Sequence, residues 1–115
     1  MISVVIPVFN EIGSLTELVD QLKSVLKIMK EWEILFVDDG SSDGSTEFLT
    51  KISENDKNIT LIQFHRNYGK SAALAEGFKL AKGQYLITMD ADLQDDPAEF
   101  PNLIKKLEEG YDLVS

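Results

Sequence analysis

The chain has 115 residues and no cysteine, and 20 acidic against 11 basic residues give it a formal net charge of −9. This length suits one domain with a core of modest size, and the lack of cysteine excludes disulfides and thiolate zinc sites. The acidic balance argues against nucleic acid, or an anionic membrane surface, as a partner held by general electrostatics. Because no apolar stretch approaches the ~20 residues of a membrane span and no signal-peptide pattern opens the sequence, we expect a soluble, cytoplasmic domain.

Strand and helix patterns then alternate along the chain. A continuous β-branched run predicts a strand buried on both faces over Ile2–Val8. Ser14 and Glu17 have the spacing of a capping box, which predicts that a helix begins here and continues to about Met29. The next elements predicted are a strand over 33–37, a helix over 45–52, a strand over 59–64 and a helix over 71–81.

The second half of the chain continues this alternation. A fourth strand is predicted over Tyr85–Met89, Asp96 is expected to cap a helix that ends near Glu109, and a fifth strand begins at Tyr111. Repeated strand–helix units predict an α/β fold, a three-layer sandwich in which helices cover both faces of a mostly parallel sheet. Since the fifth strand only begins before the sequence stops, we expect residues 1–115 to be a single domain truncated from a longer protein.

The residues that follow the fourth strand suggest a metal site. In extended backbone Asp90 and Asp92 would point to the same side, with Cα atoms ~7 Å apart, and Gln94 would add a neutral oxygen to the row. Three hard oxygen ligands suit Mg²⁺ or Mn²⁺, especially where a phosphate completes the coordination. Two aspartates at this spacing are also common in surface turns, so they indicate a metal site only together with the other polar clusters in the sequence.

Polar clusters follow the other strands too, at the sheet edge where open parallel sheets bind ligands. Asn10 and Glu11 follow the first strand, residues 38–45 follow the second, and Arg66 and Lys70 follow the third. Carboxylates beside cations and turn glycines are the composition expected around a nucleotide diphosphate. Dinucleotide binding is excluded, because the first strand is not followed by G-x-G-x-x-G, and no P-loop is present.

Four segments resemble the family 2 glycosyltransferases, whose nucleotide-binding half has the GT-A fold. In the family's order and spacing they are residues 4–11 (VVIPVFNE), 37–45 (VDDGSSDGS), 66–70 (RNYGK) and 89–97 (MDADLQDDP). The last two are most similar to the branch that transfers sugars to polyprenyl phosphates, the dolichyl-phosphate mannose or glucose synthase type. The resemblance implies inverting, metal-dependent transfer of a sugar from UDP- or GDP-sugar to a polyprenyl phosphate, at the cytoplasmic face of a membrane.

The resemblance also implies roles for individual residues. Mg²⁺ or Mn²⁺ would be held by Asp90, Asp92 and Gln94, and Asp92 would be catalytic through the metal. Asp43 and Ser45 are interpreted mainly as turn and helix-cap residues. The nucleotide sugar would contact Pro7, Phe9, Glu11, Val37, Asp39, Lys70, Asp90 and Ala91.

Two alternatives stay open. A family 2 enzyme acting on a sugar hydroxyl would place its catalytic carboxylate further along the chain, and a non-catalytic module would bind the sugar nucleotide without transfer. A phosphotransfer domain is disfavoured, because the acidic pairs follow the second and fourth strands and not the first. The acceptor site and any membrane contact are expected beyond this chain, so it alone would transfer little or no sugar. The base, the sugar, the acceptor and the oligomeric state are left open.

Overall fold

The structure, a computed structural model, describes residues 1–92 and 113–114. Strand and helix alternate as predicted, and the first and third strands have the predicted bounds. The predicted helix from Asp96 to Glu109 and the candidate ligand Gln94 lie outside the described residues. The elements are β1 (Ile2–Val8), α1 (Ile12–Leu26), β2 (Trp32–Asp39), α2 (Ser45–Asn55), β3 (Ile59–Phe64), α3 (Lys70–Leu80), β4 (Tyr85–Thr88) and β5 (Leu113–Val114).

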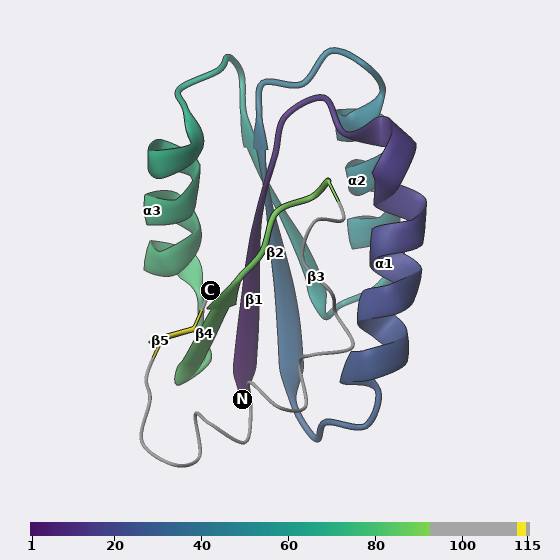
Figure 1. Ribbon diagram of the computed structural model, residues 1–115, viewed down its shortest axis with the longest axis vertical. Coiled ribbons are helices and arrows are strands. Elements are labelled where there is room, and N and C mark those ends of the chain that lie inside the picture. Colours follow the sequence, from purple (N-terminus) through teal and green to yellow (C-terminus); the bar gives the residue numbers. More distant parts are fainter. Residues whose placement is uncertain (93–112, 115) are drawn as a thin grey trace.

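The strands form one five-stranded sheet in the order β3-β2-β1-β4-β5, and every pairing within it is parallel. Helices α1 and α2 cover one face and α3 covers the other, which confirms the three-layer sandwich (Figure 1). The chain moves outward from β1 to β3 and then returns to place β4 on the other side of β1. The strand order therefore reverses between β1 and β4, and a crevice for ligands is expected beyond their carboxyl ends.

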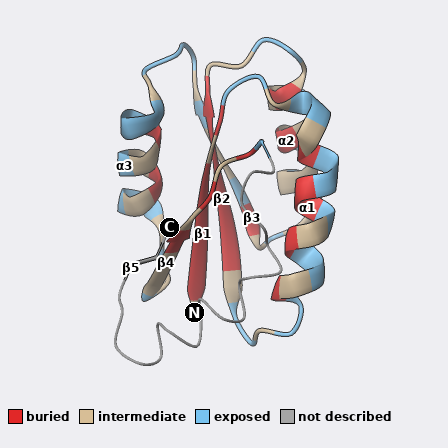
Figure 2. Ribbon diagram, in the orientation of Figure 1, coloured by how far each residue is buried: buried red, intermediate tan, exposed pale blue. Residues whose placement is uncertain are grey.

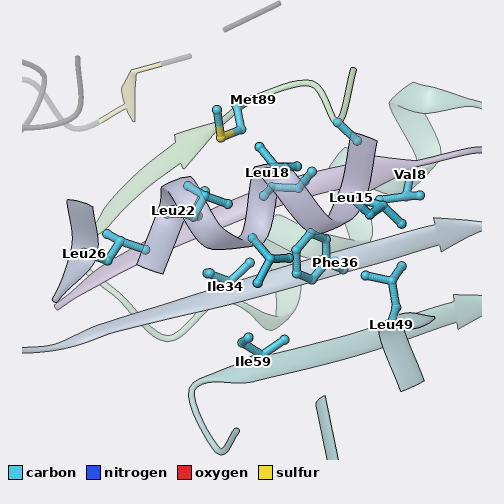
Figure 3. Packing of buried hydrophobic residues seen from close by; sticks show 14 of the residues in the cluster. Val8, Leu15, Leu18, Leu22, Leu26, Ile34, Phe36, Leu49, Ile59 and Met89 are labelled. Carbon is cyan, nitrogen blue, oxygen red and sulfur yellow. The ribbon is translucent and has the colours of Figure 1, made fainter. Parts of the chain in front are cut away.

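The larger part of the core lies between the sheet and α1 with α2. Leu15, Leu18, Leu22 and Leu26 are fully buried along one side of α1, as the helical spacing predicts. Figure 2 shows the buried residues concentrated on the central strands and on the inward sides of the helices. Figure 3 shows these leucines in one cluster with residues of the sheet and with Met89, which follows β4.

A smaller cluster packs α3 against the opposite face of the sheet. It contains the fully buried Val5, Val37 and Ala73. The helix approaches the sheet closely at Gly77, where a Cβ would lie 2.3 Å from Val5 Cγ1. Among the described residues, no helix is long and apolar enough to cross a membrane.

The predicted capping box at the start of α1 is wrong. The helix begins at Ile12, two residues before Ser14, and no side chain of its own caps it. The caps come instead from the segment after β2. The Asp43 carboxylate accepts a hydrogen bond from the Ile12 N–H at 3.1 Å, and the Ser45 hydroxyl accepts one from the Glu11 N–H at 3.1 Å. Tertiary contacts thus replace the local cap that the sequence pattern indicated.

Candidate functional site

A cavity of about 450 Å³ opens where the strand order reverses, beyond the carboxyl ends of β1 and β4. Four chain segments form it: the end of β1 with the residues after it, the end of β2, the start of α3 with the residues before it, and residues 90–92 after β4. Its lining combines carboxylates, one ammonium group and an aromatic ring. The lining residues are Pro7, Val8, Phe9, Glu11, Asp39, Asn67, Gly69, Lys70, Asp90, Ala91 and Asp92.

Most of the predicted contact residues line this cavity, but Val37 does not. Its side chain is fully buried in the cluster beneath α3, which places it away from the cavity. Sequence reasoning missed Val8, Asn67 and Gly69. All three lie inside the segments that resemble the family, so their position in those motifs could have indicated that they line the cavity.

One of the two aspartates after β4, Asp90, meets the lysine that begins α3. β4 ends at Thr88 and residues 91 and 92 form a turn, so Asp92 reaches the cavity from a turn and not from the extended backbone expected, while Asp90 lies just before that turn. Lys70 Nζ lies 2.5 Å from Asp90 Oδ1, and the two side chains are 60% and 39% exposed. Within the described part of the chain, no three His, Asp or Glu side chains lie close enough together to hold a metal ion.

Asp39 holds the segment that leads into α3. Asp39 is 3% exposed, and its carboxylate accepts hydrogen bonds from the Tyr68 N–H at 2.7 Å and the Gly69 N–H at 3.0 Å. The Asn67 side-chain amide donates a third at 3.1 Å. Gly69 has φ of 103°, a backbone conformation that favours glycine. Asp39 therefore fixes the approach of Lys70 to the cavity, besides lining the cavity itself.

Replacing Asp39 by asparagine is expected to lower the free energy of unfolding by about 1–3 kcal/mol. The amide keeps one acceptor oxygen but turns an NH₂ group toward backbone donors that the carboxylate now satisfies. Denaturant unfolding measures the loss, with Asp20→Asn, an exposed change on α1, as the control. Equal stability of Asp39→Asn and the control would contradict this role of Asp39.

Asp38 acts on the turn after β2. It is fully buried, and its carboxylate accepts hydrogen bonds from the Ser41 N–H and from the Thr46 hydroxyl. Gly40, in this turn, has φ of 78°, a conformation that favours glycine, and it packs against the backbone of Arg66. Asp38 is thus a structural residue that joins the end of β2 to α2.

The segments after β1 and β2 are bound to each other. The Asn10 N–H donates to the Ser41 hydroxyl at 2.9 Å, and the Asn10 side-chain oxygen accepts from the Ser42 N–H at 2.8 Å. Together with the two caps of α1, these bonds hold Phe9 and Glu11 at the cavity wall. Phe9 is 46% exposed, so its ring is available to a ligand.

The Asp43 carboxylate serves the first turns of both α1 and α2. It accepts from the Ile12 N–H and from both the N–H and the hydroxyl of Ser45, which confirms the turn and cap role predicted for Asp43. Desolvation raises the pKa of Asp43, but the hydrogen bonds from the Ser45 hydroxyl and from the backbone lower the pKa below its usual 3.8. Its ionised form is therefore favoured by folding.

Acid should remove the contribution of Asp43 to stability. Because the folded-state pKa is lowered, the contribution is complete above the unfolded-state pKa near 3.8 and is lost as the pH falls through the folded-state value. We expect Asp43→Asn to lose less unfolding free energy than the wild type between about pH 5 and about pH 2. Thermal unfolding across this range measures it. If the stability of Asp43→Asn fell with decreasing pH as steeply as that of the wild type, Asp43 would not be a source of the acid sensitivity.

Comparisons with known proteins show the family and the fold of the chain. Residues 3–115 match the family model described as Glycosyl transferase family 2. The undecaprenyl-phosphate 4-deoxy-4-formamido-L-arabinose transferase of Salmonella choleraesuis is 49% identical over 98% of this chain. The chain covers 35% of that relative's length.

Solved structures show the same fold. A mannosyltransferase from Pyrobaculum calidifontis, solved in complex with GDP-Man and Mn²⁺, superposes with a TM-score of 0.80 at 26% identity, over 92% of this chain and 32% of that one. Residues 1–349 of TarS from S. aureus, solved with UDP-GlcNAc, superpose with a TM-score of 0.76 at 24% identity, over 94% of this chain and 31% of that one.

Proposed function

Because the chain belongs to the glycosyltransferase family 2, we propose that its cavity is the donor site of an inverting enzyme that transfers a sugar from UDP- or GDP-sugar to a polyprenyl phosphate. One observation carries the proposal. The cavity at the strand reversal brings four carboxylates, a lysine and an exposed aromatic ring together from four separate segments. This is the combination that a nucleotide diphosphate requires.

The nucleotide end of the donor fits the wall made by the segments after β1 and β2. Phe9 offers an exposed ring on which a base can stack, and it has no hydroxyl to add a hydrogen bond. Pro7 and Glu11 line the same wall, and Asp39 retains acceptor capacity beside its three intramolecular bonds. The ring N–H groups of uracil and guanine are donors that suit such a carboxylate.

The diphosphate end fits Asp90, Asp92 and Lys70. The donor set of Asp90 and Asp92 fits Mg²⁺ or Mn²⁺, which prefer hard oxygen ligands, and Gln94 would follow them as a third ligand. The Lys70 ammonium lies close to Asp90, which supports the proposal of a cation beside this carboxylate. When bound, the metal would supply Lewis-acid stabilisation of the charge on the departing diphosphate, with Asp92 acting through it. Lys70 would then turn toward a phosphate oxygen.

The acceptor is proposed to be a polyprenyl phosphate, because the Salmonella relative is named for transfer to undecaprenyl phosphate. A phosphate monoester, with a second pKa of about 6, is already an anionic nucleophile and needs no general base. The chain spans about a third of the length of this relative. We therefore place the acceptor site, and contact with the cytoplasmic face of a membrane, in residues outside this chain.

A transfer assay tests the acceptor. The full-length protein that carries this chain is incubated with radiolabelled nucleotide sugars and Mn²⁺, and offered either undecaprenyl phosphate or a glycan with free hydroxyls. We expect label in the lipid phosphate, and no label when Asp92→Asn replaces the wild type. Transfer to the hydroxyl acceptor alone would favour the alternative branch of the family. Nucleotide binding without transfer to either acceptor would favour a binding module.

A further inference from the structure

We infer that Ser14 is a positioning residue for the metal-binding turn. Ser14 lies in the first turn of α1, yet its hydroxyl lies 2.6 Å from the Ala91 carbonyl oxygen, to which it donates. A longer approach of 3.2 Å joins the same hydroxyl to the Glu11 carbonyl oxygen. Because one hydroxyl carries one proton, the shorter contact is the stronger bond. Ala91 stands between the two candidate ligands, so this bond acts directly on the backbone that carries them.

The turn is held from both faces of the sheet. On the α3 side, Lys70 pairs with Asp90. On the α1 side, Ala91 is 3% exposed within the larger core cluster, Met89 packs in the same cluster (Figure 3), and Ser14 binds the Ala91 carbonyl. β4 pairs regularly with β1 only as far as Thr88, so the turn is outside the regular ladder.

The start of α1, which carries the Ser14 donor of this hydrogen bond, is itself held in place by other contacts. It is capped by Asp43 and by Ser45 from the segment after β2, and Phe9 and Glu11 immediately precede it. Ser14 thus connects the wall proposed for the base with the turn proposed for the metal. We assign to it the orientation of the Asp90 and Asp92 carboxylates for a divalent cation, an inference that rests on the proposed function.

Three variants test the inference. Ser14→Ala removes the hydroxyl, Ser14→Thr keeps it, and Ser24→Ala removes an exposed hydroxyl from the same helix. Hydrogen–deuterium exchange without metal reports on the turn itself. We expect peptides covering residues 86–92 to exchange about fivefold faster in Ser14→Ala, and at the wild-type rate in the other two variants. Unchanged exchange in Ser14→Ala would overturn the inference, whatever the protein binds.

Mn²⁺ affinity, followed by electron paramagnetic resonance of the free ion, separates positioning from a purely structural bond. We expect Ser14→Ala to bind Mn²⁺ about tenfold more weakly at a temperature where it is fully folded, and Ser14→Thr to recover most of the loss. Wild-type affinity in Ser14→Ala, despite faster exchange, would overturn the positioning role. Absence of Mn²⁺ binding by the wild type would instead overturn the metal site of the proposed function, and the positioning role with it.

Discussion

Replacing Asp92 by asparagine is expected to weaken Mn²⁺ binding at the cavity by about 100-fold or more. Asparagine has nearly the same volume as aspartate but no charge, so the change removes a hard anionic ligand and leaves the shape of the turn. Asp90→Asn should have a similar effect, and it should also release Lys70 from its partner at 2.5 Å. Binding of the nucleotide should fall with that of the metal, because the proposed metal would help Asp90 and Asp92 hold the diphosphate.

Mn²⁺ titration with and without nucleotide measures this loss, and circular dichroism checks that each variant is folded. Asp20→Asn, which removes the same charge from the exposed face of α1, is the matched control and should bind as the wild type does. If the Asp92→Asn variant retained wild-type affinity for Mn²⁺, the turn after β4 would not be the metal site.

Replacing Gly40 by alanine should destabilise the fold by about 3 kcal/mol or more. The added Cβ would lie 2.5 Å from the Arg66 carbonyl carbon and 2.6 Å from the Asn67 nitrogen. These are backbone atoms, which cannot move aside as the end of a flexible side chain can. Gly40 also has φ of 78°, so alanine would be strained even with space around it. Denaturant unfolding measures the change.

The same substitution should weaken nucleotide binding more than its effect on stability explains, because Asn67 and Gly69 line the cavity just after Arg66. Gly13→Ala provides the matched control. Gly13 lies in α1 with no atom within 4 Å of the position of a Cβ, and alanine favours a helix by up to about 1 kcal/mol over glycine. A Gly40→Ala protein as stable as Gly13→Ala would contradict the close packing described.

The strands were predicted well where burial dominates the sequence pattern. β1 is buried along nearly its whole length, so its apolar run defines it without ambiguity. β2 extends further than predicted because Asp38 and Asp39 belong to the strand although both are carboxylates. Their polarity suggested a loop. Hydrogen-bond donors outside the strand, including Thr46 and Tyr68, satisfy both carboxylates inside the fold.

The residues that line the cavity were predicted where a sequence motif follows a strand of the parallel sheet. Contacts between side chains and residues distant in the sequence were not predicted. Phe9, Lys70 and Asp92 line the cavity because the carboxyl ends of neighbouring parallel strands meet at one edge. Ser14 had the local spacing of a helix cap, yet it binds a carbonyl 77 residues away. Such a partner has no signature in the spacing of nearby residues, because it depends on how β4 returns beside β1.

The proposed donor site is tested most directly by calorimetric titration of the chain with UDP and with GDP, in the presence of Mn²⁺ and again after EDTA. We expect one nucleotide to bind in a metal-dependent manner, and Asp92→Asn to abolish the binding. That result would also identify the donor base. Absence of binding of either nucleotide by the folded chain, or binding that is equal after EDTA, would contradict the cavity at the strand reversal as a metal-dependent donor site.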